Sequence, residues 1–137
     1  MYKIYSSILH HRLAESIDKH LTRTQYGFRQ AKSTSQAIQI LRRIIETGAS
    51  SINKTIMVLL DWEKAFDRIN RESIARTLTR AGIPEPLKQA LISTLNNTTF
   101  YVQIGDETSS TQEQSAGIRQ GCPLSPYMFL IIMTFLF

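Results

Sequence analysis

The feature that most constrains the fold is a short apolar run near the middle of the chain. Thr55 to Leu60 reads Thr-Ile-Met-Val-Leu-Leu, is rich in β-branched residues, and is followed directly by Asp61. A continuous apolar run of this length favours a strand buried on both faces, which other elements must cover. The sequence therefore predicts a sheet with helices around it, and it places Asp61 at the end of a buried strand.

Apolar residues recur at helical spacing on both sides of this run. Ser33 to Gln36 has the form of a capping box, and Asn70 and Ser125 are residue types that cap helix N-termini. Prolines open one helix, and Gly48 and Gly82 stand where helices end. Helices are expected over residues 2–20, 33–48, 70–82 and 84–96, with a last, strongly apolar helix from Ser125 onward.

A hairpin is expected between the last two helices. Phe100, Val102 and Ile104 alternate with more polar residues, which predicts a half-buried strand. Gly105-Asp106-Glu107 forms a turn, and a polar return strand is expected to end near Ala116. Helices combined with an antiparallel hairpin predict an α+β fold, with several helices packed on a small, mainly antiparallel sheet.

The charge of the chain is concentrated in its first third. Met1 to Ser50 contain eight Lys or Arg residues against three Asp or Glu residues, which accounts for the whole net charge of +5. A basic segment of this kind favours a polyanionic partner such as nucleic acid. Five residues are candidates for such contacts: Arg12, Lys19, Arg23, Arg29 and Lys32.

Neither a disulfide nor a membrane span is expected. Cys122 is the only cysteine of the chain, so no intrachain disulfide can form, and an intracellular compartment fits without a choice between nucleus and cytoplasm. Tyr127 to Phe137 is apolar apart from Thr134, but its 11 residues fall short of the roughly 20 that cross a bilayer. A buried helix is the expected structure of this run.

Two segments contain residues suited to chemistry. Asp61, at the end of the expected strand, could hold a divalent metal ion or could simply begin a turn. Asp67 could share that site, but a structural role such as capping the helix at Asn70 is favoured. The loop from Gly117 to Pro126 places Arg119, Gln120 and Gly121 before a helix N-terminus, which suits a phosphate or sugar contact as well as an ordinary connecting loop.

Four ordered motifs, spread over nearly the whole chain, resemble those of reverse transcriptases. Leu60 to Ile69 (Leu-Asp-Trp-Glu-Lys-Ala-Phe-Asp-Arg-Ile) resembles the first catalytic motif, and Arg119 to Pro126 (Arg-Gln-Gly-Cys-Pro-Leu-Ser-Pro) resembles the next major one. Tyr2-Lys3-Ile4, together with Gln25 to Arg29 and Ser33-Thr34, resembles motifs of the fingers. The residues of the second motif are most similar to those of the non-LTR (LINE-type) retrotransposon enzymes.

The resemblance implies a partial right-hand polymerase that uses Mg²⁺, an RNA template, a DNA primer and deoxynucleotide triphosphates. Residues 1–54 would be helices of the fingers, and residues 55–137 would be a palm segment. Asp61 would be the catalytic, metal-binding carboxylate, and Phe66 would lie under the sugar of the incoming nucleotide. The remaining nucleotide contacts implied are the backbone amides of Lys64 and Ala65, with Gln120, Gly121 and, less directly, Arg29.

One expected element of the family is missing from the sequence. Two-metal catalysis needs a second carboxylate source, and no Asp-Asp pair occurs among the 137 residues. Gly105-Asp106-Glu107 precedes the Gln120-Gly121 motif, which is the wrong order for a substitute. The resemblance therefore implies a segment that begins and ends inside the polymerase core, without the rest of the palm and the thumb. The expected function is that of an inactive polymerase fragment. The alternatives are a non-catalytic nucleic-acid-binding remnant and a decayed retroelement copy.

Overall fold

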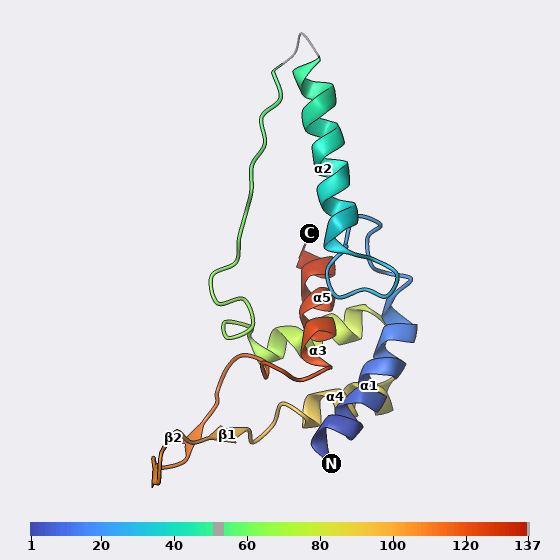
Figure 1. The fold of residues 1–137 in the computed structure, drawn as a ribbon. Coiled ribbons are helices and arrows are strands. Elements are labelled where there is room, and N and C mark those ends of the chain that lie inside the picture. The colour runs from blue at the N-terminus through green and yellow to red at the C-terminus, as the bar shows by residue number, and fades with distance from the viewer. Residues whose placement is uncertain (51–53, 137) are drawn as a thin grey trace. The chain divides into compact units, whose positions relative to one another are not determined.

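The computed structural model describes residues 1–50 and 54–136, and the chain forms two units in it. Unit 1 comprises Met1–Leu21 and the segment from Lys64 onward, and unit 2 comprises Thr22–Glu63. Figure 1 shows the course of the chain through both units. No helix among the described residues is both long and apolar enough to cross a membrane.

Four helices contain about half of the described residues of unit 1. Asn70 caps the second of them by accepting hydrogen bonds from the backbone N–H groups of Glu72 and Ser73, as the sequence predicts. Gly82, with φ +67°, follows that helix, and Pro86 lies in the first turn of the next one. The helices are α1 (Tyr2–Ile17), α3 (Arg71–Arg80), α4 (Glu85–Ser93) and α5 (Ser125–Leu136).

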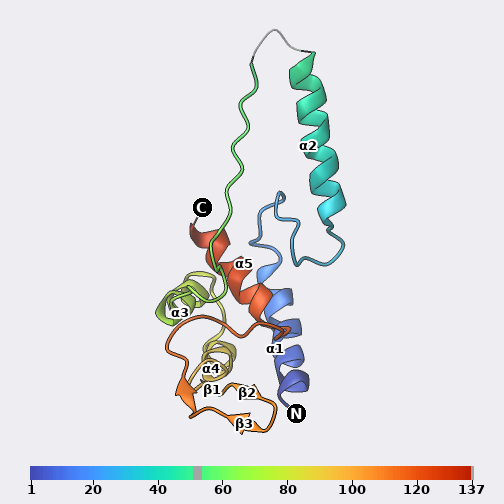
Figure 2. The same ribbon diagram turned by 60° about the vertical axis from the view of Figure 1, so that its left-hand side comes forward.

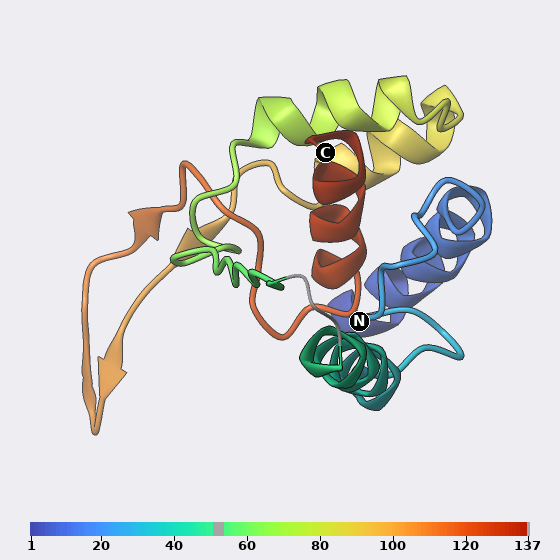
Figure 3. The same ribbon diagram turned by 90° about the horizontal axis from the view of Figure 1, so that it is seen from above.

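These four helices enclose one hydrophobic core. Helix α5 packs on α1 and α3, and α4 packs on the same two helices, so the contacts close a ring. Figure 3 shows α5 (red) from the side, with α3 (yellow-green) crossing near its C-terminal end and α1 (blue) beside its N-terminal end. Leu13, Leu78, Leu91 and Met128 are almost completely buried, one from each helix. Each of the four helices therefore contributes side chains to the same core.

A hairpin extends from the helices of unit 1, as Figure 2 shows beside α4. Its two ladders are antiparallel, and Ile104 pairs with Glu107 across a turn in which Gly105 has φ +59°. The predicted half-burial is wrong, because Val102 and Ile104 are exposed and no helix contacts the strands within the described residues. The strands are β1 (Thr99–Phe100) paired with β4 (Gln112–Glu113), and β2 (Gln103–Ile104) paired with β3 (Glu107–Thr108).

Unit 2 consists of a loop, helix α2 (Thr34–Ala49) and an extended segment that runs beside it (Figures 1 and 2). The predicted capping box is present, since Ser33 accepts from the Gln36 backbone N–H and Gln36 accepts from the Ser33 backbone N–H. No described residue of this unit is buried. Helix propensity and capping, not a core of its own, therefore define the structure of unit 2.

The predicted buried strand at residues 55–60 is wrong. This segment is extended but forms no ladder, and Ile56, Val58 and Leu60 are 87%, 74% and 83% exposed. A strand is stable only where neighbouring strands accept its hydrogen bonds and other elements cover its side chains. The described residues of unit 2 provide only α2 as a neighbouring element, so neither condition is met.

Most predicted helix boundaries also differ from the structure by one to three residues; α4, for example, ends at Ser93 and not at residue 96. Helix α1 ends at Ile17, not at residue 20, and α2 continues through Gly48 to Ala49. Helix α5 begins at Ser125, so this residue is the first of the helix and not its cap. Differences of this size are usual because helix termini fray. The α+β class itself is confirmed, with five helices and small antiparallel sheets in the described residues.

Candidate functional site

The two motif segments of unit 1 are joined by their backbones. The Gly117 N–H donates to the carbonyl oxygen of Ile69 at 2.9 Å, and the Ile118 N–H donates to that of Phe66, also at 2.9 Å. Ile69 and Ile118 are both buried in the core, which fixes the two segments to the same place in the fold. The end of the first motif and the start of the second therefore form one local structure, although about 50 residues separate them.

Gly117 makes this contact possible. Its φ is +80°, a conformation that glycine adopts without the steric cost of a Cβ. A Cβ at this position would stand 2.8 Å from the carbonyl oxygen and 2.9 Å from the Cα of Asp67. Those atoms are backbone and cannot move aside independently. Glycine is therefore required here both for its conformation and for the close approach of the two segments.

A side-chain hydrogen bond adds to the backbone contacts. The Gln120 side chain donates from Nε2 to Oδ1 of Asp67 at 3.1 Å, and both residues are exposed. Asp67 does not cap the helix that follows, because Asn70 caps α3, so this one form of the predicted structural role is wrong. No local pattern in the sequence relates an acidic residue in one motif to an amide in another. The pair forms because the folded backbone brings the two motifs together, so it could not be predicted from the sequence.

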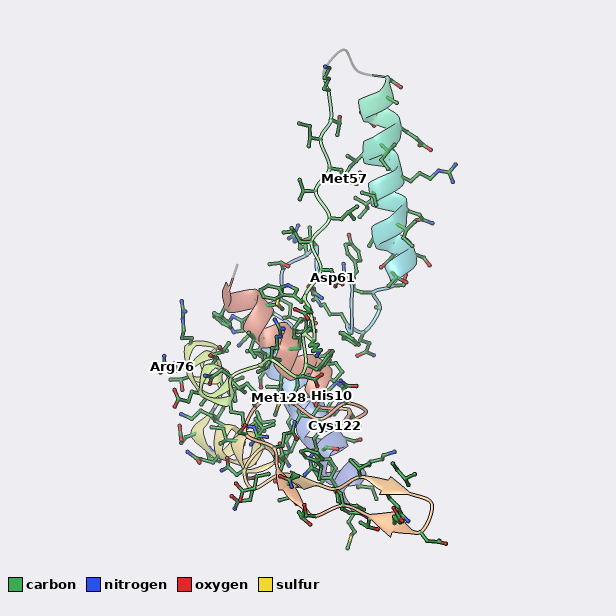
Figure 4. The ribbon with its side chains drawn as sticks, turned by 90° about the vertical axis from the view of Figure 1, so that its left-hand side faces the viewer. His10, Met57, Asp61, Arg76, Cys122 and Met128 are labelled. Carbon is green, nitrogen blue, oxygen red and sulfur yellow. The ribbon has the colours of Figure 1, made fainter. Side chains whose placement is uncertain are left out.

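Helix α1 holds the other side of the same loop. The Arg119 guanidinium lies over the ring of Tyr2, 4.8 Å from its centroid, and the Tyr2 hydroxyl is 3.3 Å from Sγ of Cys122. Cys122 is buried, and Figure 4 shows it among the helices of unit 1. The residues on both sides of Gln120-Gly121 are thus anchored by one aromatic side chain.

Burial and this contact shift the pKa values of both Tyr2 and Cys122. Burial, followed by the hydrogen bond with Cys122, raises the pKa of Tyr2 to about 12. Burial acts to raise the pKa of Cys122, but the hydrogen bond with Tyr2 and those with the backbone of Leu124 and Ser125 together lower it. Both directions are those expected if the Tyr2 hydroxyl donates to the sulfur of Cys122.

Phe66 is half-buried and stacks on Phe129 of α5. The ring centroids are 5.3 Å apart and the planes differ by 27°. Phe66 also packs against the hydrophobic core at the edge of the motif. One face of its ring is therefore fixed by the protein, which orients the side chain at the surface where the two motifs meet.

The residues before Phe66 form a tight turn. Lys64 has φ +51°, and its carbonyl oxygen accepts hydrogen bonds from the backbone N–H groups of Asp67 and Arg68 at 3.0 Å each. Within the described residues, the N–H groups of Lys64 and Ala65 donate no hydrogen bond. A turn with positive φ and unused N–H groups can accept an anion such as a phosphate.

Gly121 also has a positive φ, +76°, but a Cβ built on it would meet nothing within 4 Å. Its side of the loop is exposed, so the backbone there is open to contact. Gly117 and Gly121 are therefore required for different reasons. Gly117 permits close packing inside the protein, whereas Gly121 permits a loop conformation without a side chain at the surface.

Asp61 and Arg29, the remaining residues predicted for the site, belong to unit 2. Asp61, labelled in Figure 4, is exposed and accepts a hydrogen bond from the Trp62 backbone N–H at 2.9 Å. The Arg29 guanidinium donates to the carbonyl oxygen of Thr22 at 2.9 Å, which closes the loop before α2. Unit 1 contains Lys64, Ala65, Phe66, Gln120 and Gly121, and hydrogen bonds join the two segments in which they lie. Asp61 and Arg29 are described only within unit 2.

Carboxylate oxygen is the donor type that Mg²⁺ prefers, and Asp61 offers one such group at the surface. Among the described residues, no three His, Cys, Asp or Glu side chains form a cluster that could hold a metal ion. Mg²⁺ is commonly bound by one or two carboxylates together with water and substrate phosphates. The chemistry of Asp61 therefore fits a Mg²⁺ site that a nucleotide completes, but not one built by these residues alone.

Comparison with known proteins identifies relatives of the chain. The family model described as "Reverse transcriptase (RNA-dependent DNA polymerase)" matches residues 1–137. A Pol polyprotein from the type-1 retrotransposable element R2 of Popillia japonica is 27% identical over 134 residues, which are 97% of this chain and 19% of that protein. The RNA-directed DNA polymerase from the mobile element jockey of Drosophila melanogaster is 28% identical and is covered over 14% of its length.

A probable RNA-directed DNA polymerase from transposon BS of Drosophila melanogaster is 25% identical over 131 residues, or 94% of this chain and 14% of that protein. The chain thus spans less than a fifth of the length of these curated relatives. No solved structure matches it. The relatives confirm the similarity to non-LTR retrotransposon enzymes that the residues Arg119 to Pro126 indicate. With its whole length matched by the family model, the chain belongs to the reverse transcriptase family.

Proposed function

We propose that these 137 residues contribute the first carboxylate and part of the nucleotide-binding surface of an RNA-directed DNA polymerase. The enzyme would add deoxynucleotides to the 3′-hydroxyl of a DNA primer paired with an RNA template. One observation supports this most strongly. The segment that follows Asp61 and the Gln120-Gly121 loop are joined by backbone and side-chain hydrogen bonds in a chain of the reverse transcriptase family.

The residues of unit 1 have distinct roles in this proposal. Phe66, held from behind by Phe129, forms the floor under the deoxyribose and leaves no room for a 2′-hydroxyl. The free N–H groups of Lys64 and Ala65 bind the triphosphate, and the exposed backbone at Gly121 lies against the nascent base pair. Gln120 contacts the incoming nucleotide. These groups hold the nucleotide in position while the primer hydroxyl reacts at the α-phosphate.

Asp61 is the proposed metal-binding and catalytic carboxylate. Its oxygens would hold Mg²⁺ together with the nucleotide phosphates, as the donor chemistry allows. When bound, Mg²⁺ supplies charge stabilisation at the attacking and leaving oxygens of phosphoryl transfer. Arg29 would contact template or nucleotide from unit 2. Its guanidinium is planar and always charged, which suits a phosphate.

The two-metal reaction needs carboxylates beyond Asp61, because one side chain cannot fix two ions about 4 Å apart. We therefore propose that the 137-residue chain alone does not extend primers. The direct test is a primer-extension assay on an RNA template with Mg²⁺ and deoxynucleotides. Extension by the purified chain would contradict the proposal.

A complete polymerase that contains this segment provides the second test. Asp61→Asn removes one charge at nearly constant shape, so synthesis should fall by about a thousandfold or more with little change in stability. Asp106→Asn is a matched control, since Asp106 lies at the exposed turn of the hairpin. Wild-type turnover in Asp61→Asn would refute the assignment of the metal site.

A second candidate function is binding of nucleic acid without catalysis. The observation in its favour is the excess of positive charge in the first 50 residues, among them Arg12, Lys19, Arg23, Arg29 and Lys32. Binding of this kind releases counterions, so the affinity for RNA should fall steeply between about 50 and about 200 mM salt. A titration of RNA against the protein at the two salt concentrations tests this function. Absence of binding at low salt, or an affinity independent of salt, would exclude this function.

A further inference from the structure

We infer that Asp67 is a positioning residue that fixes the orientation of the Gln120 side-chain amide toward the incoming nucleotide. This inference rests on the proposed function, in which Gln120 contacts that nucleotide. It concerns a residue that otherwise has no part in the chemistry. The structural basis is the 3.1 Å hydrogen bond from Nε2 of Gln120 to Oδ1 of Asp67.

The backbones on which these two side chains stand are held together independently of the hydrogen bond. Ile118 and Gly117 donate to the carbonyl oxygens of Phe66 and Ile69, on either side of Asp67. The Gly117 Cα lies so close to the Asp67 backbone that a Cβ would not fit. The relative position of Asp67 and the loop is therefore set before the side chains meet, so little conformational entropy is lost when they pair.

The loop is also fixed beyond Gln120. Arg119, the residue before it, lies over the Tyr2 ring, and Cys122, two residues after it, contacts the Tyr2 hydroxyl. Because residues on both sides of Gln120 are anchored to α1, the backbone of Gln120 has little conformational freedom. The terminal amide of Gln120 can still rotate about its side chain. Among the described residues, Asp67 is the only hydrogen-bond partner of that amide.

The chemistry of the pair determines the direction of the amide. An ionised carboxylate can only accept hydrogen bonds, so Gln120 must turn its NH₂ group, not its carbonyl oxygen, toward Asp67. The carbonyl oxygen Oε1 then faces away from Asp67 as an acceptor. In addition, the negative charge of Asp67 repels phosphate oxygens from this spot. The pair is suited to a neutral donor of the nucleotide, such as a sugar hydroxyl or a base amino group, and not to the triphosphate.

Asp67→Asn tests this polarity at nearly constant shape. An Asn side chain can accept from the Gln120 NH₂ group or donate to its carbonyl oxygen, so a hydrogen bond persists but the orientation is no longer fixed. Asp106→Asn is the matched control, because it removes the same charge at the exposed hairpin turn. A general effect of charge or stability would appear in both variants.

The first readout is the side-chain amide of Gln120 in the ¹⁵N-labelled chain, identified by its absence in Gln120→Glu. In the wild type and in Asp106→Asn, its NMR shifts should coincide, because the hydrogen bond with Asp67 is intact in both. In Asp67→Asn, the shifts should move, because the orientation of the amide is no longer fixed. A Gln120 amide with the same shifts in all three proteins would overturn the inference, whether or not any longer protein polymerises.

The second readout is steady-state kinetics in a complete polymerase that contains this segment. Asp67→Asn should raise KM for the deoxynucleotide by about threefold or more and leave kcat within about twofold, since binding is altered and the reacting groups are not. Asp106→Asn should change neither. An unchanged KM in Asp67→Asn would overturn the role toward the nucleotide. If the polymerase with wild-type residues extends no primer while the shifts of the Gln120 amide still change in Asp67→Asn, the proposed function fails and the pairing of the two side chains stands.

Discussion

The rings of Phe66 and Phe129 stack with their centroids 5.3 Å apart, which ties the first motif to the closing helix α5. The resemblance to reverse transcriptases implies that Phe66 contacts the sugar of a nucleotide. The structure gives it a packing partner on one side, and its contact with a sugar stays a prediction. The two roles are compatible, because a ring that selects a sugar by its bulk must itself be held still.

Replacement of Phe129 by Leu should weaken both stability and sugar selection. Loss of the aromatic pair should lower the free energy of unfolding by about 1 kcal/mol. In a complete polymerase, the freed Phe66 ring should reduce the preference for deoxynucleotides over ribonucleotides, measured as the ratio of kcat/KM values, by about fivefold or more.

Phe135→Leu is the control for this variant, because Phe135 lies on the same helix and has the Arg80 guanidinium, not another aromatic ring, over it. It should cost comparable stability and leave the preference for deoxynucleotides unchanged. If both variants changed sugar selection equally, the stack of Phe66 on Phe129 would have no specific part in it.

The two glycines of the loop region should differ in their response to alanine. In Gly117→Ala the added Cβ meets the Asp67 backbone and φ is positive, so the free energy of unfolding should fall by about 3 kcal/mol or more. In Gly121→Ala only the conformational cost of about 1 kcal/mol applies, because the Cβ would meet nothing. Urea denaturation of the two variants measures the difference. Equal losses would mean that the contact of Gly117 with Asp67 is not tight in solution.

Tyr2 should contribute to the stability of the fold through both its hydroxyl and its ring. Tyr2→Phe removes the hydroxyl near Cys122 and keeps the ring under Arg119, so the loss of stability should be about 1 kcal/mol or less. Tyr2→Leu removes both contacts and should cost about 1 kcal/mol more. Thermal unfolding of the two variants separates these effects. The ring contact would be unimportant if the two variants were equally stable.

His10 should make stability depend on pH. Its ring packs edge-on against Tyr127 with centroids 4.5 Å apart, and burial, followed by the charge of His11, lowers its pKa. A lowered pKa means that the folded protein prefers the neutral ring. The contribution to stability is therefore complete above about pH 6.5, the ordinary pKa of His, and is lost as the pH falls through the lowered value.

Measurement of the free energy of unfolding from pH 7.5 to pH 5 should accordingly give a decrease toward acid that is smaller in His10→Phe. His20→Gln is the control, since His20 is exposed after the end of α1. It should retain the pH dependence of the wild type. A steeper loss of stability in His10→Phe than in the wild type would contradict the assigned direction.

Much of the local structure could be predicted from the sequence. The capping box at Ser33 and Gln36, the cap at Asn70 and the turn at Gly105 are present as expected. Each depends on residues within four positions of one another, so the pattern contains the whole interaction. The same holds for the reverse transcriptase motifs, which are contiguous runs that the family model also matches. The assignment of residues 1–54 and 55–137 to fingers and palm stays a prediction, because it concerns the complete polymerase.

The predicted strand at residues 55–60 failed for the opposite reason. Val58 and Leu60 are apolar enough for a sheet interior, yet a strand is defined by neighbours that the run itself does not contain. The exposure of Val102 and Ile104 in the hairpin has the same cause. Alternation of polar and apolar residues predicts which side of a strand could be buried, but not whether another element is there to cover it.

By itself, the sequence determined the family, the positions of the helices and the residue types available for chemistry, because these are properties of short segments. Only the tertiary structure decided that Asp67 pairs with Gln120 and that Tyr2 anchors both neighbours of the loop. Side chains about 50 or more residues apart in the chain meet only after a core such as that around Leu13 and Leu78 has fixed their backbones. Their energies depend on distances of a few ångströms, which no pattern along the sequence encodes.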